Sequence, residues 1–273
     1  MSSENIKETQ WAKRPVIIEG NKIRSIFDPW HSWQWYSPFD VYGRDREENL
    51  YMRFAALESD EEIKDFISNY GFLGLQESSL REVMIDDDIV IEETIDEIRF
   101  QISRMRIILN LQQAITEKKP LHSRDALNNL RELYKGKKTI IISKAIDQNN
   151  LETTDLERKW DVIKLDSHRT IVQEINLELQ GVHQLLIYDV SAERYLQRWS
   201  IPTLLAAMYT MFSLDLQGGK ILRKCANPTC PKYFEVYAND TRKIYHDPSC
   251  AALQAQRNFR RKKEQQKKEQ TKG

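Results

Sequence analysis

Apolar residues recur at helical spacing along much of the chain. In residues 89–117 they follow one another at steps of three and four, the pattern of an amphipathic helix with one buried face. Three acidic residues at positions 86–88 precede this stretch and suit the positive end of a helix dipole. Similar patterns predict four shorter helices, the last of them apolar enough to be buried; they cover residues 61–70, 126–134, 170–179 and 202–216.

Runs of β-branched and aromatic residues predict a few short strands. They cover residues 139–142, 183–188 and 194–199, and the last two are close enough in sequence to pair as a hairpin. Gly218 and Gly219 then separate the last of these helices from a segment of different character. The pattern predicts an α+β protein with a mostly helical N-terminal body and a small sheet over residues 1–219.

The composition is that of a globular protein. The chain has 273 residues, of which 40% are apolar and 10% aromatic, enough for a sizeable core. The most apolar run, residues 201–214, is shorter than the roughly 20 residues that cross a bilayer. The polar first ten residues lack the apolar stretch of a signal peptide. We expect a cytoplasmic protein that does not interact with membranes.

The formal net charge is zero, but the charge is divided unevenly. The chain has 41 basic and 41 acidic residues, and residues 220–273 hold 14 of the basic and 5 of the acidic ones. This segment therefore carries +9 and the rest of the chain −9. An acidic body with a basic C-terminal segment favours a polyanion as the partner of that segment. A contact between the two parts of the chain is the other explanation.

All three cysteines of the chain lie within 26 residues, at Cys225, Cys230 and Cys250. An odd number of cysteines without a secretion signal does not fit a disulfide framework. With His246 they form the spacing C-x4-C-x15-H-x3-C, two close pairs joined by a loop, as in tetrahedral zinc sites. We predict one Zn²⁺ bound by Cys225, Cys230, His246 and Cys250. The alternative is three reduced thiols and a surface histidine.

The residues around the two pairs predict a small finger over residues 220–268. Residues 232–237 and 243–245 have the composition of two short strands that can pair. Asp247 is suited to cap a helix that Pro248 begins, which places the last cysteine in the first turn, where the helix dipole stabilises a thiolate. This is a treble-clef-like finger, and four protein ligands leave no open position, so the zinc is predicted to be structural rather than catalytic.

A helix is predicted from residue 251 to about residue 268, a stretch without Pro or Gly. Ala252, Ala255 and Phe259 share one face, which we expect to pack on the finger. The other side chains suit phosphates and base edges. The predicted nucleic-acid-binding residues are Gln254, Arg257, Asn258, Arg260, Arg261, Lys262 and Lys263. The alternative is a solvated, frayed tail, and residues 264–273 are predicted to be disordered in either case.

The finger and the segment before it resemble a known family, the CGNR-type zinc finger. The residues that carry the resemblance are Cys225, Cys230, Tyr233, Phe234, Cys250 and the Ala/Arg-rich helix that follows. The resemblance covers roughly residues 170–262 and implies a bacterial transcription regulator of the stress-response type with DNA as its partner. Two positions differ: the third ligand, usually Cys, is His246, and Ala251-Ala252-Leu253 stands where the family has Gly-Asn-Arg.

Residues 30–39 contain three Trp, one Tyr and one Phe, and aromatic side chains this dense are buried or bind something. They form either a lid over the core or part of a small-ligand pocket, for which the candidates are Trp30, Trp33, Trp35 and Tyr36. No phosphate-binding glycine loop, nucleophile elbow or H-E-x-x-H motif occurs in the chain. We therefore expect that the protein is not an enzyme.

These observations favour a DNA-binding regulator with a structural zinc, in which the body over residues 1–219 would sense a signal or assemble the protein. Three alternatives remain. An RNA-associated factor would use the same basic helix, with Tyr233, Phe234 and Tyr237 stacking on bases. A protein-interaction module would dock its basic tail on an acidic partner. An enzyme would have its active site in the aromatic-rich N-terminal body. A homodimer is the ordinary expectation for a bacterial regulator.

Overall fold

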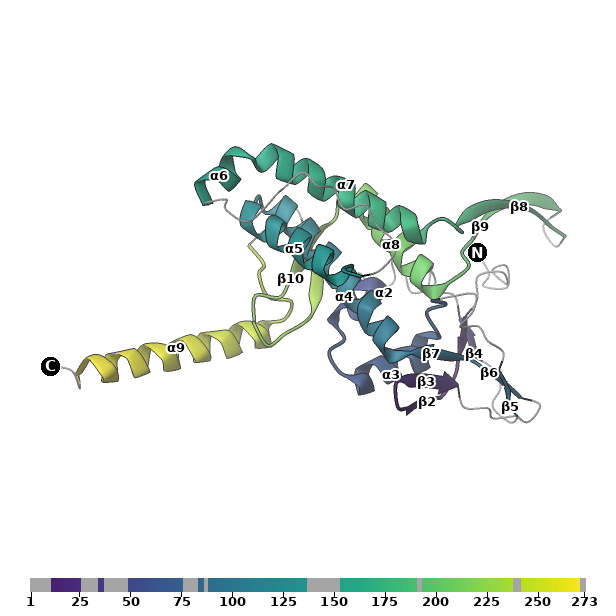
Figure 1. The fold of residues 1–273 in the computed structure, drawn as a ribbon, viewed down its shortest axis with the longest axis horizontal. Coiled ribbons are helices and arrows are strands. Elements are labelled where there is room, and N and C mark those ends of the chain that lie inside the picture. Colours follow the sequence, from purple (N-terminus) through teal and green to yellow (C-terminus); the bar gives the residue numbers. More distant parts are fainter. Residues whose placement is uncertain are drawn as a thin grey trace.

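The computed structural model describes residues 11–25, 34–36, 49–75, 83–85, 88–136, 153–190, 193–237 and 242–270. Over these residues the chain is a mixed α+β protein in which helices predominate, which confirms the predicted fold class (Figure 1). The helices are α2 (Leu50–Ala56), α3 (Asp60–Tyr70), α4 (Ile95–Thr116), α5 (Pro120–Leu133), α6 (Thr153–Arg158), α7 (Trp160–Glu178), α8 (Leu204–Gln217) and α9 (Pro248–Gln270).

The described strands form small antiparallel sheets around the helices. One sheet has three strands in the order β2-β3-β7, and the pairs β1-β4, β5-β6, β8-β9 and β10-β11 form two-stranded sheets. The strands are β1 (Trp11–Lys13), β2 (Val16–Glu19), β3 (Lys22–Ser25), β4 (Gln34–Tyr36), β5 (Val83–Ile85), β6 (Asp88–Val90), β7 (Glu92–Thr94), β8 (His183–Asp189), β9 (Arg194–Ser200), β10 (Ile221–Lys224) and β11 (Tyr233–Val236).

The core is built around α4, which packs against α2, α5 and α7 (Figure 1). Its apolar side chains recur at three- and four-residue steps, and Ile98 and Met105 have no exposed surface. α8 is buried along most of its length, as its apolar sequence predicts, and Phe212 packs on Tyr51 of α2 with ring centroids 5.3 Å apart. Burying a large apolar side chain contributes roughly 1.5–3 kcal/mol, so these buried side chains stabilise the packing of the helices on one another.

The apolar spacing predicts that the long helix begins at residue 89, but in the structure it begins at Ile95. The residues before it form β6 and β7, and β7 joins the β2-β3 hairpin as a third strand. Residues 89–91 are all β-branched, which favours an extended backbone when a neighbouring strand can pair with it. The acidic residues in the first turn of the helix are therefore Asp96 and Glu97, not the aspartates at 86–88.

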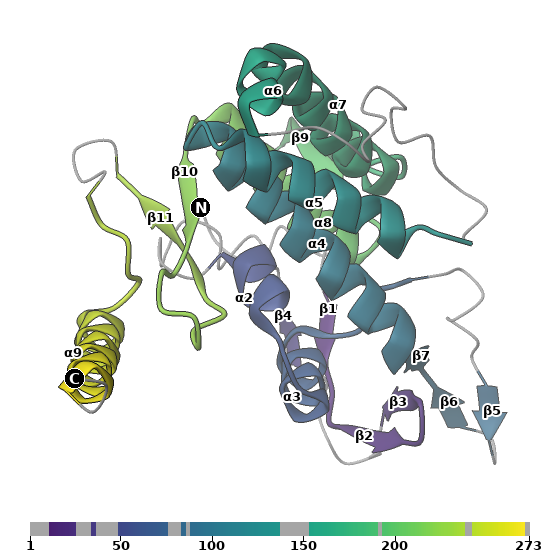
Figure 2. The ribbon, with the colours of Figure 1, turned by 60° about the vertical axis from the view of Figure 1, so that its left-hand side comes forward.

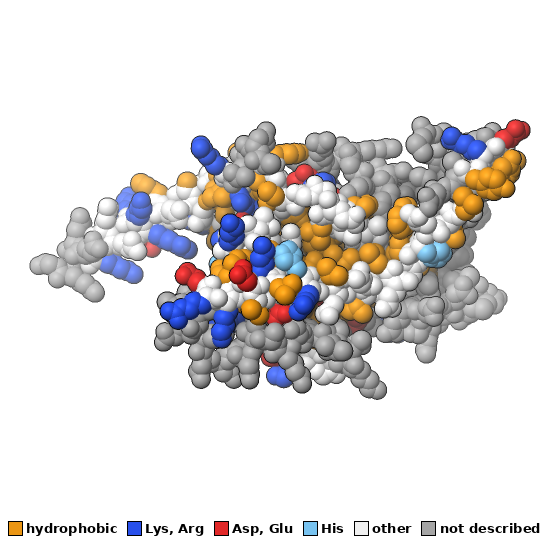
Figure 3. Space-filling view, turned by 90° about the horizontal axis from the view of Figure 1, so that it is seen from above, with side chains coloured by type: hydrophobic (Ala, Val, Ile, Leu, Met, Phe, Trp, Pro, Cys, Tyr) orange, Lys and Arg blue, Asp and Glu red, His pale blue; other side chains and the backbone are white. Residues whose placement is uncertain are grey.

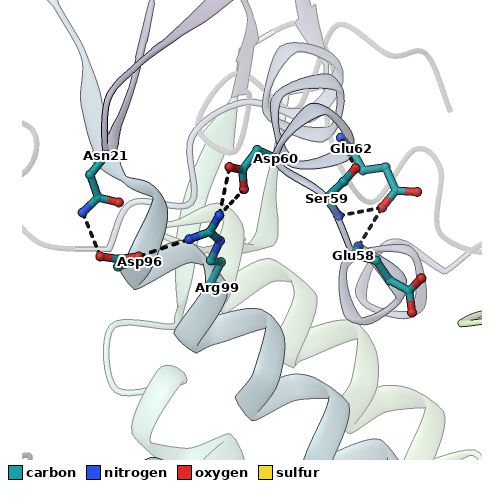
Figure 4. Close-up of polar contacts among 7 residues, drawn as sticks. All are labelled: Asn21, Glu58, Ser59, Asp60, Glu62, Asp96 and Arg99. Carbon is teal, nitrogen blue, oxygen red and sulfur yellow. Dashed lines mark hydrogen bonds and ion pairs between the residues drawn. The ribbon is translucent and has the colours of Figure 1, made fainter.

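α3 confirms the helix predicted from residue 61, and its start is fixed by side chains. The Ser59 hydroxyl accepts a hydrogen bond from the Glu62 N–H at 3.2 Å, and the Glu62 carboxylate accepts one from the Ser59 N–H at 3.1 Å (Figure 4). Arg99 of α4 donates to both carboxylate oxygens of Asp60, at 2.6 and 2.9 Å. The first turn of α3 is therefore held against the first turns of α4.

Two helices are longer than their apolar spacing predicts. α5 begins at Pro120 rather than at residue 126, and α7 begins at Trp160 rather than at residue 170. The added turns bury small polar side chains such as Ser123 and Ser167, which an apolar periodicity does not reveal. The pairing of β8 with β9 confirms the predicted hairpin, and the strand predicted at residues 139–142 lies outside the described residues.

The aromatic cluster lies largely outside the described residues. Trp30 and Trp33 are not among them. Trp35 and Tyr36 belong to β4, whose backbone pairs with β1 so that Tyr36 lies opposite Trp11. Their side chains are not described, so the ligand pocket assigned to Trp30, Trp33, Trp35 and Tyr36 stays a prediction.

Candidate metal centre

The first pair of cysteines lies on a tight turn between two strands. β10 and β11 pair antiparallel up to Lys224 and Tyr233, and the turn that joins them contains Cys225 and Cys230. The Cys225 N–H donates to the Lys232 carbonyl at 2.9 Å, which closes the turn. This knuckle presents both thiols on the same side, as a shared metal ion requires.

The hairpin of the finger differs from the predicted one. Its strands are β10 and β11, whereas the sequence predicts that residues 232–237 pair with residues 243–245. The latter segment has no strand structure, but it still lies against the knuckle, since the Ala226 N–H donates to the Ile244 carbonyl at 2.9 Å. The strand before Cys225 is the one that pairs with β11, because a hairpin through the knuckle places both cysteines at its end.

The second pair of ligands lies at the start of α9. Asp247 caps this helix, its carboxylate accepting from the Ser249 N–H at 2.8 Å, and Pro248 is the first helical residue. Cys250 follows in the first turn, with 7% of its surface exposed. The predicted cap and the predicted place of Cys250 are therefore confirmed.

The three cysteines and His246 form one compact cluster. Their ligand atoms all lie within 4.8 Å of one another, and the distance from Cys230 Sγ to His246 Nδ1 is 3.4 Å. Tetrahedral zinc, with Zn–S bonds of about 2.3 Å and Zn–N bonds of about 2.0 Å, separates neighbouring ligand atoms by about 3.5–3.8 Å. Cys225, Cys230, His246 and Cys250 are thus positioned to bind one metal ion, and three sulfurs with one imidazole nitrogen are consistent with zinc.

The three thiols are close enough together for their protonation to depend on whether a cation is bound. Burial, together with the neighbouring Cys225 and Cys250 thiols, raises the pKa of Cys230 to about 11, although a hydrogen bond from the backbone at Lys232 acts in the opposite direction. Without a cation, three buried thiolates this close would repel one another. A divalent ion reverses this balance because it binds the deprotonated thiols directly. The raised pKa describes the thiols without a metal, so the support for a metal site is the close grouping of the four ligand atoms.

Arg257 supports the knuckle from α9. Its guanidinium donates to Asn227 Oδ1 at 2.6 Å and to Thr229 Oγ1 at 2.8 Å, and Asn227 is almost fully buried. The sequence predicts Arg257 as a nucleic-acid contact, but in the structure both terminal nitrogens of its guanidinium donate hydrogen bonds within the finger. Asn227 and Thr229 are not among the predicted site residues, although an Asn-Pro-Thr turn between two metal ligands is a sequence signal for such a supporting role.

The face of α9 that meets the finger is not the predicted one. Ala252, Ala255 and Phe259 are exposed, Phe259 to 68%, while Gln254 and Arg257 lie partly buried toward the knuckle. The rotation of the helix is set by Cys250, which must point at the other ligands. A helix turns by about 100° per residue, so Phe259, nine positions later, points away from the metal site.

Beyond the finger, α9 projects away from the helical body and carries exposed cations (Figures 1 and 2). Figure 3 shows basic side chains along this helix. Gln254 donates to Asn258 Oδ1 at 3.2 Å. The exposed members of the predicted nucleic-acid surface are Asn258, Arg260, Arg261, Lys262 and Lys263. Residues 264–270, predicted to be disordered, continue the helix, since Glu, Gln and Lys all favour it.

The finger is fastened to the body through its hairpin (Figure 2). Tyr233 is buried in the main core, and its hydroxyl donates to Asn110 Oδ1 of α4 at 2.8 Å. Arg223 of β10 pairs with Glu117 at the end of α4 at 2.7 Å. The domain boundary between residues 219 and 220 stays a prediction. Residues on both sides of it belong to one apolar core, to which the finger contributes Leu222 and Tyr233.

No protein-family model matches this chain, and neither the curated proteins nor the solved structures include a match to it. The CGNR-like assignment therefore rests on the sequence resemblance alone. Among the described residues, no helix combines the length and the apolar character needed to span a membrane.

Proposed function

We propose that this chain is a zinc-finger protein that binds DNA through α9 and regulates transcription. The observation that carries the proposal is the cluster of Cys225, Cys230, His246 and Cys250 at the root of an exposed cationic helix. In this proposal the zinc is structural. It is held by four protein side chains, and it fixes the direction in which α9 leaves the body.

The charge and exposure of α9 support a polyanion as the partner. Arg260, Arg261, Lys262 and Lys263 follow one another and are all exposed, so they surround the helix with positive charge. Arg and Lys bind phosphates without regard to sequence, while Asn258 and an Arg side chain can also bind base edges in a major groove that admits a helix. Residues in the finger itself, such as Arg257, would act on the DNA only by holding the helix in place.

Salt dependence tests this proposal. Affinity for duplex DNA should fall linearly with the logarithm of salt concentration, with a slope of about −0.9 for each phosphate neutralised. The variant Arg260→Ala/Arg261→Ala should weaken binding and make the slope less negative by about 2. The control is Lys135→Ala/Lys159→Ala, which removes the same charge from exposed positions on the body. Affinity that does not change with salt, or equal effects of the two variants, would contradict the proposal.

Two other functions have weaker support. In an RNA-associated factor, Tyr233 and Phe234 would stack on bases, but each is only 5% exposed, which leaves Tyr237 alone at the surface. A protein-interaction module would place the basic tail on an acidic surface, yet residues 258–268 are all exposed, so the tail is not docked on its own body here. Competition between duplex DNA and structured RNA separates the first alternative from the proposal.

A further inference from the structure

The β8-β9 hairpin stands out from the helical body, at the end of the molecule opposite to α9 (Figure 1). Its strands, His183–Asp189 and Arg194–Ser200, pair over their whole length, and neither pairs with a third strand among those that the structure describes. A two-stranded ribbon without a covering layer is at best marginally stable in water. Within the part of the chain that the structure describes, Leu186 and Tyr195 of this hairpin stay largely exposed, so a second surface packed against them would stabilise it.

One face of this hairpin is apolar and exposed. The register places Gln184 opposite Trp199 and Tyr188 opposite Tyr195, so these residues and Leu186 share a face. Leu186 is 72% exposed, Tyr195 70%, and Tyr188 and Trp199 52% each. The Tyr188 and Tyr195 rings contact each other with centroids 5.2 Å apart. Figure 3 shows apolar side chains gathered at this end of the molecule.

The chemistry of this face limits what can cover it. The described side chains on its paired part, those of Gln184, Leu186, Tyr188, Tyr195 and Trp199, include no charged group, and the exposed Glu193 lies in the turn beyond them. A nucleic acid would require cations there. Contiguous exposed apolar patches with aromatic residues are typical of protein–protein contacts.

We infer that this face binds the same face of a second copy of the chain, across a two-fold axis. A two-fold contact brings a patch against itself, so any charge on the patch would meet a like charge. An uncharged face of Leu, Tyr and Trp avoids this repulsion, and each copy would bury the apolar side chains that the other leaves exposed. The inference does not depend on the nucleic-acid function, because the hairpin and α9 lie at opposite ends of the molecule.

The molar mass of the full chain in solution tests this inference. Measured by light scattering at high salt, free of nucleic acid, the wild-type chain should have twice the mass of one chain. The variant Leu186→Lys/Tyr195→Lys places like charges on the two facing patches, and its dimer dissociation constant should rise about 100-fold or more. The control Leu165→Lys/Val172→Lys changes two similarly exposed apolar residues of α7 and should remain dimeric.

Two further measurements separate a lost contact from a lost fold. The variant Leu186→Glu/Tyr195→Glu should also be monomeric, and mixing it with the lysine variant should restore a dimer. The milder variant Tyr188→Ser/Tyr195→Ser should weaken the dimer while keeping the wild-type circular dichroism spectrum. A monomeric wild type at its highest soluble concentration, a dimer that survives the lysine substitutions, or a mixture that stays monomeric would overturn the inference.

Discussion

Glu93 is a buried acidic residue that fastens a loop to the sheet. It lies in the middle of β7 with 3% of its surface exposed, and its carboxylate accepts the N–H groups of Leu73, Gly74 and Leu75 at 3.0, 2.6 and 3.3 Å. These residues follow the end of α3, and the Leu73 carbonyl in turn accepts the N–H of Leu205. The Glu93 side chain thereby joins the small sheet to the loop after α3, and the backbone of that loop continues the connection to α8.

The protonation of Glu93 should make the stability depend on pH. Burial raises the pKa of Glu93 to about 7 although the three N–H groups act in the opposite direction. The folded state then keeps a proton that the unfolded chain loses near pH 4.3. The contribution of this residue is favourable at low pH and is lost as pH rises from about 4.5 through 7.

A variant isolates this contribution. The side chain of Glu93→Gln cannot titrate. Between pH 5 and pH 8, the free energy of unfolding of the wild type should therefore fall relative to that of Glu93→Gln. Urea unfolding at a series of pH values measures it. A difference that stays constant over this range, or that shifts in favour of the wild type, would show that the carboxylate is already ionised in the folded state.

At the scale of elements, the sequence predicts most helices but not where they begin. Apolar spacing marks α3, α4 and α8 because each buries one face or more in the core. It places the start of α4 too early because Ile89, Val90 and Ile91 fit a strand as well as a helix. Only the neighbouring β2-β3 hairpin decides between the two, and pairing between distant segments leaves no periodicity in the sequence.

The same limit explains the errors in the finger. The spacing of Cys225, Cys230, His246 and Cys250 identified the cluster because metal ligands must come as close pairs of particular residue types. The strand that completes the hairpin, β10, lies before the first cysteine, outside the segment that the ligand spacing marks. The predicted orientation of α9 is wrong. An apolar face usually packs inward, but here the position of the metal ligand sets the rotation of the helix about its axis, and Phe259 is left exposed.

The contact between α9 and the knuckle yields a prediction for metal binding. Arg257→Lys keeps the charge but loses the fork that reaches Asn227 and Thr229 together. Groups that hold metal ligands in place typically change metal affinity by about 10–100-fold, so we expect a loss of this size in zinc affinity, measured by competition with a chelating dye. The control Arg260→Lys should bind zinc like the wild type. Equal affinities for all three proteins would contradict this role for Arg257.

At the scale of the whole molecule, the metal centre is not an appendage. Leu222 and Tyr233 of the finger are 2% and 5% exposed in the core of the body, and Arg223 pairs with Glu117 of α4. The free energy of metal binding is therefore coupled to the folding of this junction. α9 extends from one end of the molecule and the β8-β9 hairpin from the other, so a nucleic-acid contact and a contact between copies would not compete for surface (Figure 1).

The metal centre fixes the finger and the direction of α9, and the zinc content of the purified chain tests for it most directly. Protein prepared at high salt should contain close to one zinc per chain by elemental analysis. Cys250→Ser and His246→Ala should lose it, while the control His183→Ala, an exposed histidine on β8, should retain it. A wild-type chain without zinc, or variants that keep it at the wild-type level, would contradict the account and reduce the finger to a cluster of thiols beside a basic helix.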